Sequence, residues 1–167
     1  MQIAQRPKLT IEKTALDKYL ETVALLFQLC LIAIPFYYYS KLPDTIPIHL
    51  NALGEIDGYG SKYIIWVISI MGIGLHLLMS WLRKRPHVFN YPVKITEENA
   101  YKQYSIANRM LRVIDVAVLI LFTYIIYTFC TLGLNNTGKT SVFIPITIVL
   151  FILFYTGYYL RKSWKNN

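Results

Sequence analysis

Charged residues are scarce in this chain. Asp, Glu, Lys and Arg make up 16% of its 167 residues, whereas a soluble domain carries about 25%. Acidic residues are the rarer kind, with 9 against 17 basic ones, and 55% of the sequence is apolar. A basic excess suits nucleic acid in a soluble protein, but here the basic residues flank long apolar runs. The composition therefore favours a lipid bilayer as partner and no nucleic acid.

Cysteine is nearly absent as well. Cys30 and Cys130 each lie inside an apolar run and form no metal-binding spacing. We expect them at different depths, where they form no disulfide and act as small buried apolar side chains. We also expect no cleavable signal peptide, because about twenty residues with charges of both signs precede the first apolar run, and that run is too long for a signal-peptide core. That run is expected to remain as a first span.

Long apolar runs are what the sequence does have. Four of them, residues 21–40, 63–82, 113–132 and 141–160, reach the length of about 20 residues that a helix needs to cross a bilayer. A soluble bundle would need a polar stripe on each helix, and residues 116–122 are apolar all round. We predict an all-α integral membrane protein, one domain over 1–167, with four transmembrane helices and a long ordered extracytoplasmic loop between the first and second.

Basic residues are unequally divided between the two sides of such a protein. Lys41, Lys62 and Lys139 fall on one side, and the other 14 of the 17 fall with the two termini and the connector 83–112. Loops rich in Lys and Arg stay in the cytosol. We therefore expect a multi-pass protein of the cytoplasmic membrane with both termini cytosolic. The segments 42–62 and 133–140 would then face outward.

The cytosolic connector 83–112 contains a predicted amphipathic helix. Thr96 is a suitable N-cap, and Glu97 and Glu98 suit the positive end of a helix dipole. Apolar residues then recur at helical spacing, at Ala100, Tyr104, Ala107 and Leu111. We expect this helix to run directly into the third span.

The outward loop 42–62 is long for a connection between two helices. Its apolar residues alternate as in a short strand with one buried face, at Ile46, Ile48 and Leu50. Its glycines are expected to supply turns with positive φ, at Gly54, Gly58 and Gly60. We predict an ordered lid that packs on the helix ends.

Five polar residues make this loop a candidate binding site: Asp44, His49, Asn51, Glu55 and Asp57. A histidine with carboxylates is able to bind a divalent cation. The loop has no HExxH motif, no second histidine and no cysteine, so we predict no metal, no cofactor and no catalytic residue. Hydrogen bonds that hold turns are the favoured role of this set.

The segment 133–140, from Gly133 to Thr140, matches the phosphate-loop pattern GxxxxGK[ST]. That pattern binds nucleotides when it joins a strand to a helix. Here it joins two predicted spans on the outward side. We therefore expect no nucleotide.

The loop also resembles a known family. It carries in order Leu-Pro-Asp at 42–44, Ile-Pro at 46–47, His49, Asn51, Gly54, Asp-Gly at 57–58 and Gly-Ser-Lys at 60–62. This signature is similar to that of a bacterial membrane domain of unknown function that forms the N-terminal part of SdpI-type immunity proteins. Leu50 departs from it, since an aromatic is common there, and the further spans of SdpI-type proteins are not recognised in this chain. The resemblance implies a bacterial cytoplasmic membrane, and immunity against a membrane-active toxin or peptide, or signalling to a cytosolic regulator.

Three polar residues fall inside the predicted spans: Gln28, His76 and Asp115. An ionisable residue inside a membrane is a candidate functional group. Because the helix directions alternate, the three reach similar depths, and we expect one polar cluster facing the cytosol. Arg112, one turn before Asp115, is its expected partner. Close helix contact is expected on the second span at Gly72 and Gly74.

Three functions fit these features. The first, which we favour, is a non-enzymatic protective or signalling protein whose outer loop meets a toxic peptide or lipid and whose basic surface meets a cytosolic regulator or anionic lipid. The second is a small transporter or channel component that uses Gln28, His76 and Asp115. The third is a membrane enzyme or metal site at the loop, although no nucleophile with its base is recognisable. The oligomeric state is left open.

Overall fold

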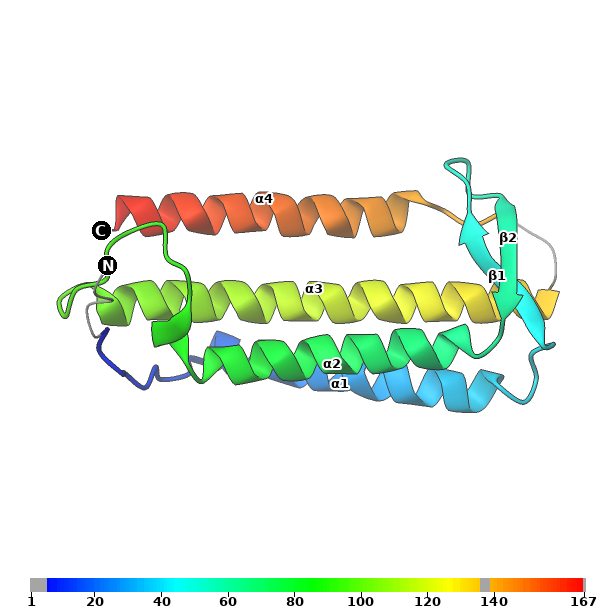
Figure 1. Cartoon of the computed structure of the whole chain (residues 1–167), viewed down its shortest axis with the longest axis horizontal. Helices are drawn as coiled ribbons and strands as arrows, with labels where there is room; N and C mark the ends of the chain where they lie inside the picture. The colour runs from blue at the N-terminus through cyan, green and yellow to red at the C-terminus, as the bar shows by residue number, and fades with distance from the viewer. Residues whose placement is uncertain (1–5, 136–138, 167) are drawn as a thin grey trace.

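The computed structural model describes residues 6–135 and 139–166. Its elements are, in order, α1 (Ala15–Tyr38), β1 (Thr45–Leu50), β2 (Ile56–Ser61), α2 (Ile64–Arg83), the short 3-10 helix η1 (Pro86–Val88), α3 (Ala100–Asn135) and α4 (Phe143–Lys165). The helices lie along one axis, with the β1–β2 hairpin at one end and both termini at the other (Figure 1). We call the first the hairpin end. We call the second the basic end, because 14 of the 17 Lys and Arg residues fall with the termini and the connector 83–112.

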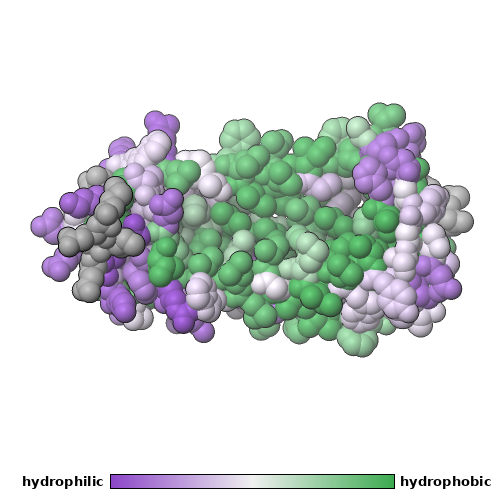
Figure 2. Space-filling model, in the orientation of Figure 1, coloured by the Kyte–Doolittle hydropathy of each residue, from purple (hydrophilic) through white to green (hydrophobic). Residues whose placement is uncertain are grey.

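Four helices are long and apolar enough to cross a membrane. The connector helix and the third apolar run form one unbroken helix, α3, of 36 residues, and the other three contain 20 to 24. Figure 2 shows hydrophobic side chains over the middle of the bundle and hydrophilic ones at both ends. Large apolar side chains such as Phe36 and Phe154 are 70% and 76% exposed. The prediction of four helices able to span a membrane is thus confirmed.

The apolar core lies between α1, α2 and α3 and extends to the hairpin. It includes Leu31 of α1, Ile65 of α2 and Ile126 of α3, all fully buried. By contrast, α4 runs along α3 (Figure 1), and only Tyr159 and Ser163 of this helix are buried. Of the two free cysteines, Cys130 is buried in the core.

Cys30 is exposed, so the expectation that both cysteines are buried is wrong for this one. It lies one helical turn after the exposed Leu26, on the same face of α1. Sequence position inside an apolar run does not distinguish a core face from a face turned outward, because both are apolar in a helix of this kind.

Contact between α1 and α2 depends on a proline and a serine. Pro35 has no N–H, so the carbonyl of Leu31, four residues earlier, lacks its usual helical donor. The Ser69 hydroxyl of α2 lies 2.8 Å from that carbonyl oxygen and 2.9 Å from the carbonyl oxygen of Ile65, and its proton serves either. Ser69 is buried, so its hydroxyl supplies the donor that Pro35 lacks at a place where water has little access.

Gly72 brings the same two helices close together. A Cβ at Gly72 would lie 2.8 Å from Leu31 Cδ1 and 3.1 Å from Phe122 Cδ1, closer than such carbons normally approach. A Cβ at Gly74 would meet nothing within 4 Å. Close contact is therefore found at Gly72, and the same expectation for Gly74 is wrong, because two residues rotate a helical position by about 200°.

The loop 42–62 forms an antiparallel hairpin in which β1 pairs with β2. The predicted strand at Ile46 is present, and its buried side chain packs on α3, where a Cβ at Gly133 would lie 2.8 Å from Ile46 Cγ2. The hairpin tip is joined to the segment before α4, because the Thr140 N–H donates to the carbonyl oxygen of Gly54 at 3.1 Å. The hairpin therefore closes over the ends of the helices.

Only Gly54 among the three loop glycines has a positive φ, of 77°. Gly58 and Gly60 lie in β2, and the expectation of turns there is wrong. A Cβ at Gly58 would lie 2.9 Å from His49 Cβ, and one at Gly60 would overlap the Ile48 side chain. These two positions give room to side chains of the opposite strand.

We predict that Ser69→Ala lowers the free energy of unfolding by about 1 kcal/mol, since it leaves the Leu31 carbonyl oxygen without a donor. In the Pro35→Ala background a normal helical N–H returns, so Ser69→Ala should then cost less. Unfolding in detergent micelles of the two single variants and the double variant measures this coupling. Independent effects of the two changes would contradict this account of the helix contact.

Candidate functional site

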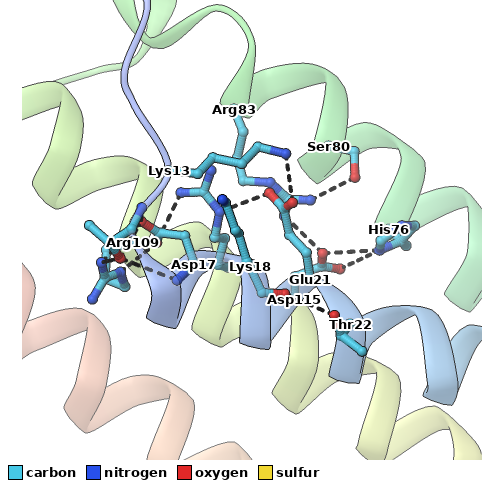
Figure 3. A network of polar contacts seen from close by, with 12 residues as sticks. Lys13, Asp17, Lys18, Glu21, Thr22, His76, Ser80, Arg83, Arg109 and Asp115 are labelled. Atoms are coloured by element: carbon cyan, nitrogen blue, oxygen red, sulfur yellow. Dashed lines mark hydrogen bonds and ion pairs between the residues drawn. The ribbon is translucent and has the colours of Figure 1, made fainter.

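Ionisable side chains from three helices meet in the basic half of the bundle (Figure 3). On α3, Arg109, Arg112 and Asp115 follow one another at intervals of three residues, so they project toward similar directions. Arg109 and Arg112 reach acidic residues of α1, and Asp115 reaches α2. One stretch of α3 thus makes charged contacts with both neighbouring helices.

The contact with α1 is built around its first turns. Thr14 caps the helix and forms a capping box with Asp17, which is 4% exposed. Arg109 Nε donates to Asp17 Oδ1 at 2.6 Å, and Arg112 Nη1 lies 3.3 Å from the same oxygen. One turn further, Glu21 accepts from Arg112 Nε at 3.1 Å. Each carboxylate of this contact therefore has an arginine partner.

The contact with α2 is built around Asp115, whose side chain is 2% exposed. Arg83 Nη1 donates to Asp115 Oδ2 at 2.8 Å, and Arg83 Nη2 donates to Ser80 Oγ at 2.7 Å. The Nδ1 atom of His76 lies 3.0 Å and 3.1 Å from the two carboxylate oxygens. The buried carboxylate is thus paired with a guanidinium and a histidine from the same face of α2.

A cavity of about 550 Å³ lies between these contacts. Its walls are formed by α1, α2 and α3, and the segment before α1 and the residues after α2 contribute at the basic end. Its lining includes Lys13, Glu21, Leu25, Gln28, His76, Ser80, Arg83, Lys84, Asn108 and Arg112. A volume of this size lies within the range of about 300–1,000 Å³ that small-molecule sites occupy.

Asn108 of α3 is the unusual member of this lining. Its side chain is 3% exposed, and its Oδ1 atom has no hydrogen-bond partner within the described residues. A buried acceptor that remains unpaired costs about 1–3 kcal/mol. A water molecule or a ligand with a donor group would satisfy this acceptor.

The three intramembrane candidates fall around this cavity. His76 and Asp115 are in contact, and Gln28 lines the cavity with His76 but makes no hydrogen bond to either within the described residues. The expected pairing of Arg112 with Asp115 is wrong, since Arg83 takes that place and Arg112 turns to α1. The spacing of Arg109, Arg112 and Asp115 at intervals of three residues is the sequence signal that could have identified Arg109 and Arg112 as members of this site. No sequence signal marked Asn108.

The five hairpin candidates separate into local contacts. His49 Nδ1 lies 2.6 Å from Asp57 Oδ1 across the two strands, and Asp44 pairs with Lys62 at 3.1 Å. The Asn51 carboxamide accepts from the backbone N–H groups of Leu53 and Glu55 at 2.9 and 3.0 Å. Within the described residues, no group of three His, Cys, Asp or Glu is placed to hold a metal ion.

Glu55 connects the hairpin tip to the segment before α4 through an ion pair. Its carboxylate accepts from Lys139 Nζ at 2.6 Å and from Asn51 Nδ2 at 3.1 Å. The hydrogen bond from Lys139, followed by that from Asn51, lowers the pKa of the Glu55 carboxyl. Lys139 and Thr140 of the phosphate-loop pattern thus contact the hairpin, Gly133 lies inside α3, and residues 136–138 of that pattern lie outside the described residues.

The fold and this site define a helical protein of multi-pass membrane type, with a β-hairpin over one end of the bundle and a charged cavity at the other. Residues 26–73 match a family described as "Domain of unknown function (DUF1648)". The match runs from α1 through the hairpin into α2, the region in which the sequence resembles a bacterial membrane domain. No curated protein and no solved structure matches the chain.

We predict that Asp115→Asn destabilises the bundle by about 3 kcal/mol or more, because Arg83 would remain buried without its carboxylate. The double variant Asp115→Asn, Arg83→Met should recover most of that loss. Unfolding in detergent measures both. Asp44→Asn is the matched control, since its side chain is 97% exposed, and removal of its pair with Lys62 should change little. An Asp115→Asn protein as stable as the wild type would contradict this role.

Proposed function

We propose that this chain is a non-enzymatic, multi-pass protein of a bacterial cytoplasmic membrane that protects the cell in the manner of SdpI-type immunity proteins. Its basic end lies in the cytosol and its hairpin faces outward. At the hairpin end it meets a membrane-active peptide. Alternatively, contact with the peptide leads to a signal that the basic end passes to a cytosolic regulator.

Charge supports the proposed orientation. Of the 17 basic residues, 14 belong to the basic end, and three belong to the hairpin end: Lys41, Lys62 and Lys139. Each of these three has a partner at its own end: Lys41 lies over the Tyr37 ring, Lys62 pairs with Asp44, and Lys139 pairs with Glu55. Cytosolic loops of membrane proteins carry the excess of Lys and Arg, so the basic end is assigned to the cytosol.

Cysteine labelling of intact bacteria tests this orientation. With Cys30 and Cys130 replaced by Ala, Asp44→Cys at the hairpin end should react with a membrane-impermeant maleimide. Lys102→Cys at the basic end, which is exposed as well, should react only after the membrane is permeabilised. The opposite pattern would reverse the proposed topology, and labelling of both positions in intact cells would argue against a membrane barrier between them.

The proposal that a peptide binds here rests on a groove beside the hairpin. It has a volume of about 270 Å³ and is lined mainly by apolar groups of β1, α3 and the segment that leads into α4, together with His49. This is slightly below the range of about 300–1,000 Å³ for small-molecule sites. It suits one or two apolar side chains of a peptide that arrives from the membrane surface.

His49 is the residue best placed to hold such a peptide. Its side chain is 72% exposed, and its Nδ1 atom is held by Asp57. Since the Asp57 carboxylate accepts the Nδ1 proton, Nε2 of the neutral ring is an acceptor. It has no hydrogen bond within the described residues and is therefore free to accept from a peptide N–H or hydroxyl group. An apolar groove with a few polar groups in its lining is the usual composition of a recognition site.

Transport through the bundle has less support. The cavity at the basic end extends to Gln28 and His76. Beyond them, toward the hairpin, the interior is filled by apolar side chains that include Leu31, Leu119 and Ile126, all fully buried. An ion that crossed this half of the bundle would need polar partners, which these apolar side chains do not provide.

We expect bacteria that express this chain to survive a membrane-active peptide at a concentration several times higher than cells without it, as measured by growth across a peptide series. His49→Trp should remove that protection by filling the groove edge. Asp57→Ala breaks the pair with His49, and Asp57 does not line the groove, so equal loss in both variants would assign the effect to hairpin stability. Unchanged sensitivity with and without the wild-type chain would contradict the proposed function.

A further inference from the structure

We propose that the cavity at the basic end binds the headgroup of an anionic phospholipid that carries free hydroxyl groups, as phosphatidylglycerol does. This goes beyond protection against a peptide, because it concerns the opposite end of the bundle. It rests on the proposed membrane insertion and not on the peptide groove. The shape, the charge and the unpaired group of the cavity each contribute to the choice of ligand.

The cavity lies between two helices that face the membrane. α1 and α2 touch where Gly72 packs on Leu31, and on the basic side of that contact the cavity separates Gln28 of α1 from His76 of α2. Figure 3 shows the polar side chains of this region reaching from α1, α2 and α3 toward one another. In a bilayer this level corresponds to the cytosolic headgroup region, where helix ends carry their basic residues.

Positive charge predominates on the cavity wall. Four basic side chains, Lys13, Arg83, Lys84 and Arg112, line it together with one acidic side chain, Glu21. Lys84 makes no ion pair within the described residues, while the other three bases contact carboxylates. A phosphodiester with one negative charge would complement this excess, as basic pockets near the cytosolic face do for anionic headgroups.

Asn108 selects for a hydroxyl group on that ligand. Asn108 lines the cavity, and its buried Oδ1 atom is an acceptor that has no partner within the described residues and needs a donor. A phosphodiester has no donor, and the choline group has none either. A glycerol headgroup supplies hydroxyl groups next to the phosphate, so one molecule would satisfy both Asn108 and the basic side chains.

Apolar surface next to the cavity favours a lipid over a soluble phosphate ester. Leu25 lines the cavity and is 54% exposed, and Leu29, one turn further along α1, is also 54% exposed. Leu77 of α2, next to His76, is 59% exposed. Acyl chains that leave the cavity would lie along this surface, whereas free glycerol phosphate would leave it uncovered.

The test uses the full chain, purified in a neutral detergent, with phosphatidylglycerol, phosphatidylcholine or glycerol 3-phosphate added at equal concentration. Phosphatidylglycerol should raise the unfolding midpoint and remain bound in native mass spectrometry, and the other two should do neither. Asn108→Leu should weaken phosphatidylglycerol binding about fivefold by loss of one hydrogen bond. Without lipid, the same variant should be at least as stable as the wild type, because the orphaned acceptor is gone.

Two further variants keep the test decisive if Asn108→Leu does not fold. Lys84→Gln removes an unpaired base from the cavity wall and should weaken binding. Lys165→Gln removes an exposed base of the same end that lies outside the cavity, and it should bind as the wild type does. Equal effects of phosphatidylcholine, equal effects of glycerol 3-phosphate, or wild-type binding by both cavity variants would each overturn the proposal. Failure of peptide protection has no bearing on these outcomes.

Discussion

Asp115 places a carboxylate among three apolar helices, where its charge has to be balanced by a nearby cation. Arg83 and His76 of α2 provide that balance. Nearer the basic end, α3 carries positive charge instead. There Arg109 pairs with Asp17 of α1, and Arg112 pairs with Glu21 of the same helix. The alignment of α1, α2 and α3 along the bundle therefore depends on charges carried by α3, since a shift of one turn would separate buried partners.

This charged arrangement divides the molecule into two halves of different character. Toward the hairpin, the three helices pack through apolar side chains and through the hydrogen bond from the Ser69 hydroxyl to the Leu31 carbonyl oxygen. Toward the basic end, ionised side chains occupy the space between the helices and leave a cavity. Long polar side chains that pair with one another fill space less completely than interlocking apolar ones. Among the described residues, Asn108 Oδ1 finds no hydrogen-bond partner there.

We propose two different partners for the two ends. At the hairpin end most candidate polar residues are occupied with holding the hairpin, which leaves an apolar groove and His49 to meet a peptide. At the basic end Lys84 and Asn108 line the cavity that we propose for an anionic headgroup. A protein that protects a membrane would gain from both, because a bound lipid would stabilise the bundle that carries the hairpin.

The sequence by itself determined the helices, the division of charge between the two ends and the strand at Ile46, because run length, charge and alternation are local properties. It also indicated that His76 and Asp115 lie at similar depth. Only the tertiary structure decided which cation Asp115 meets. Arg112 is closer in sequence, but it points to α1, while Arg83 arrives from a helix 32 residues away. The different surroundings of Gly72 and Gly74, and of Cys30 and Cys130, have the same cause: in an apolar helix, the neighbouring helices and not the sequence pattern decide which face is packed.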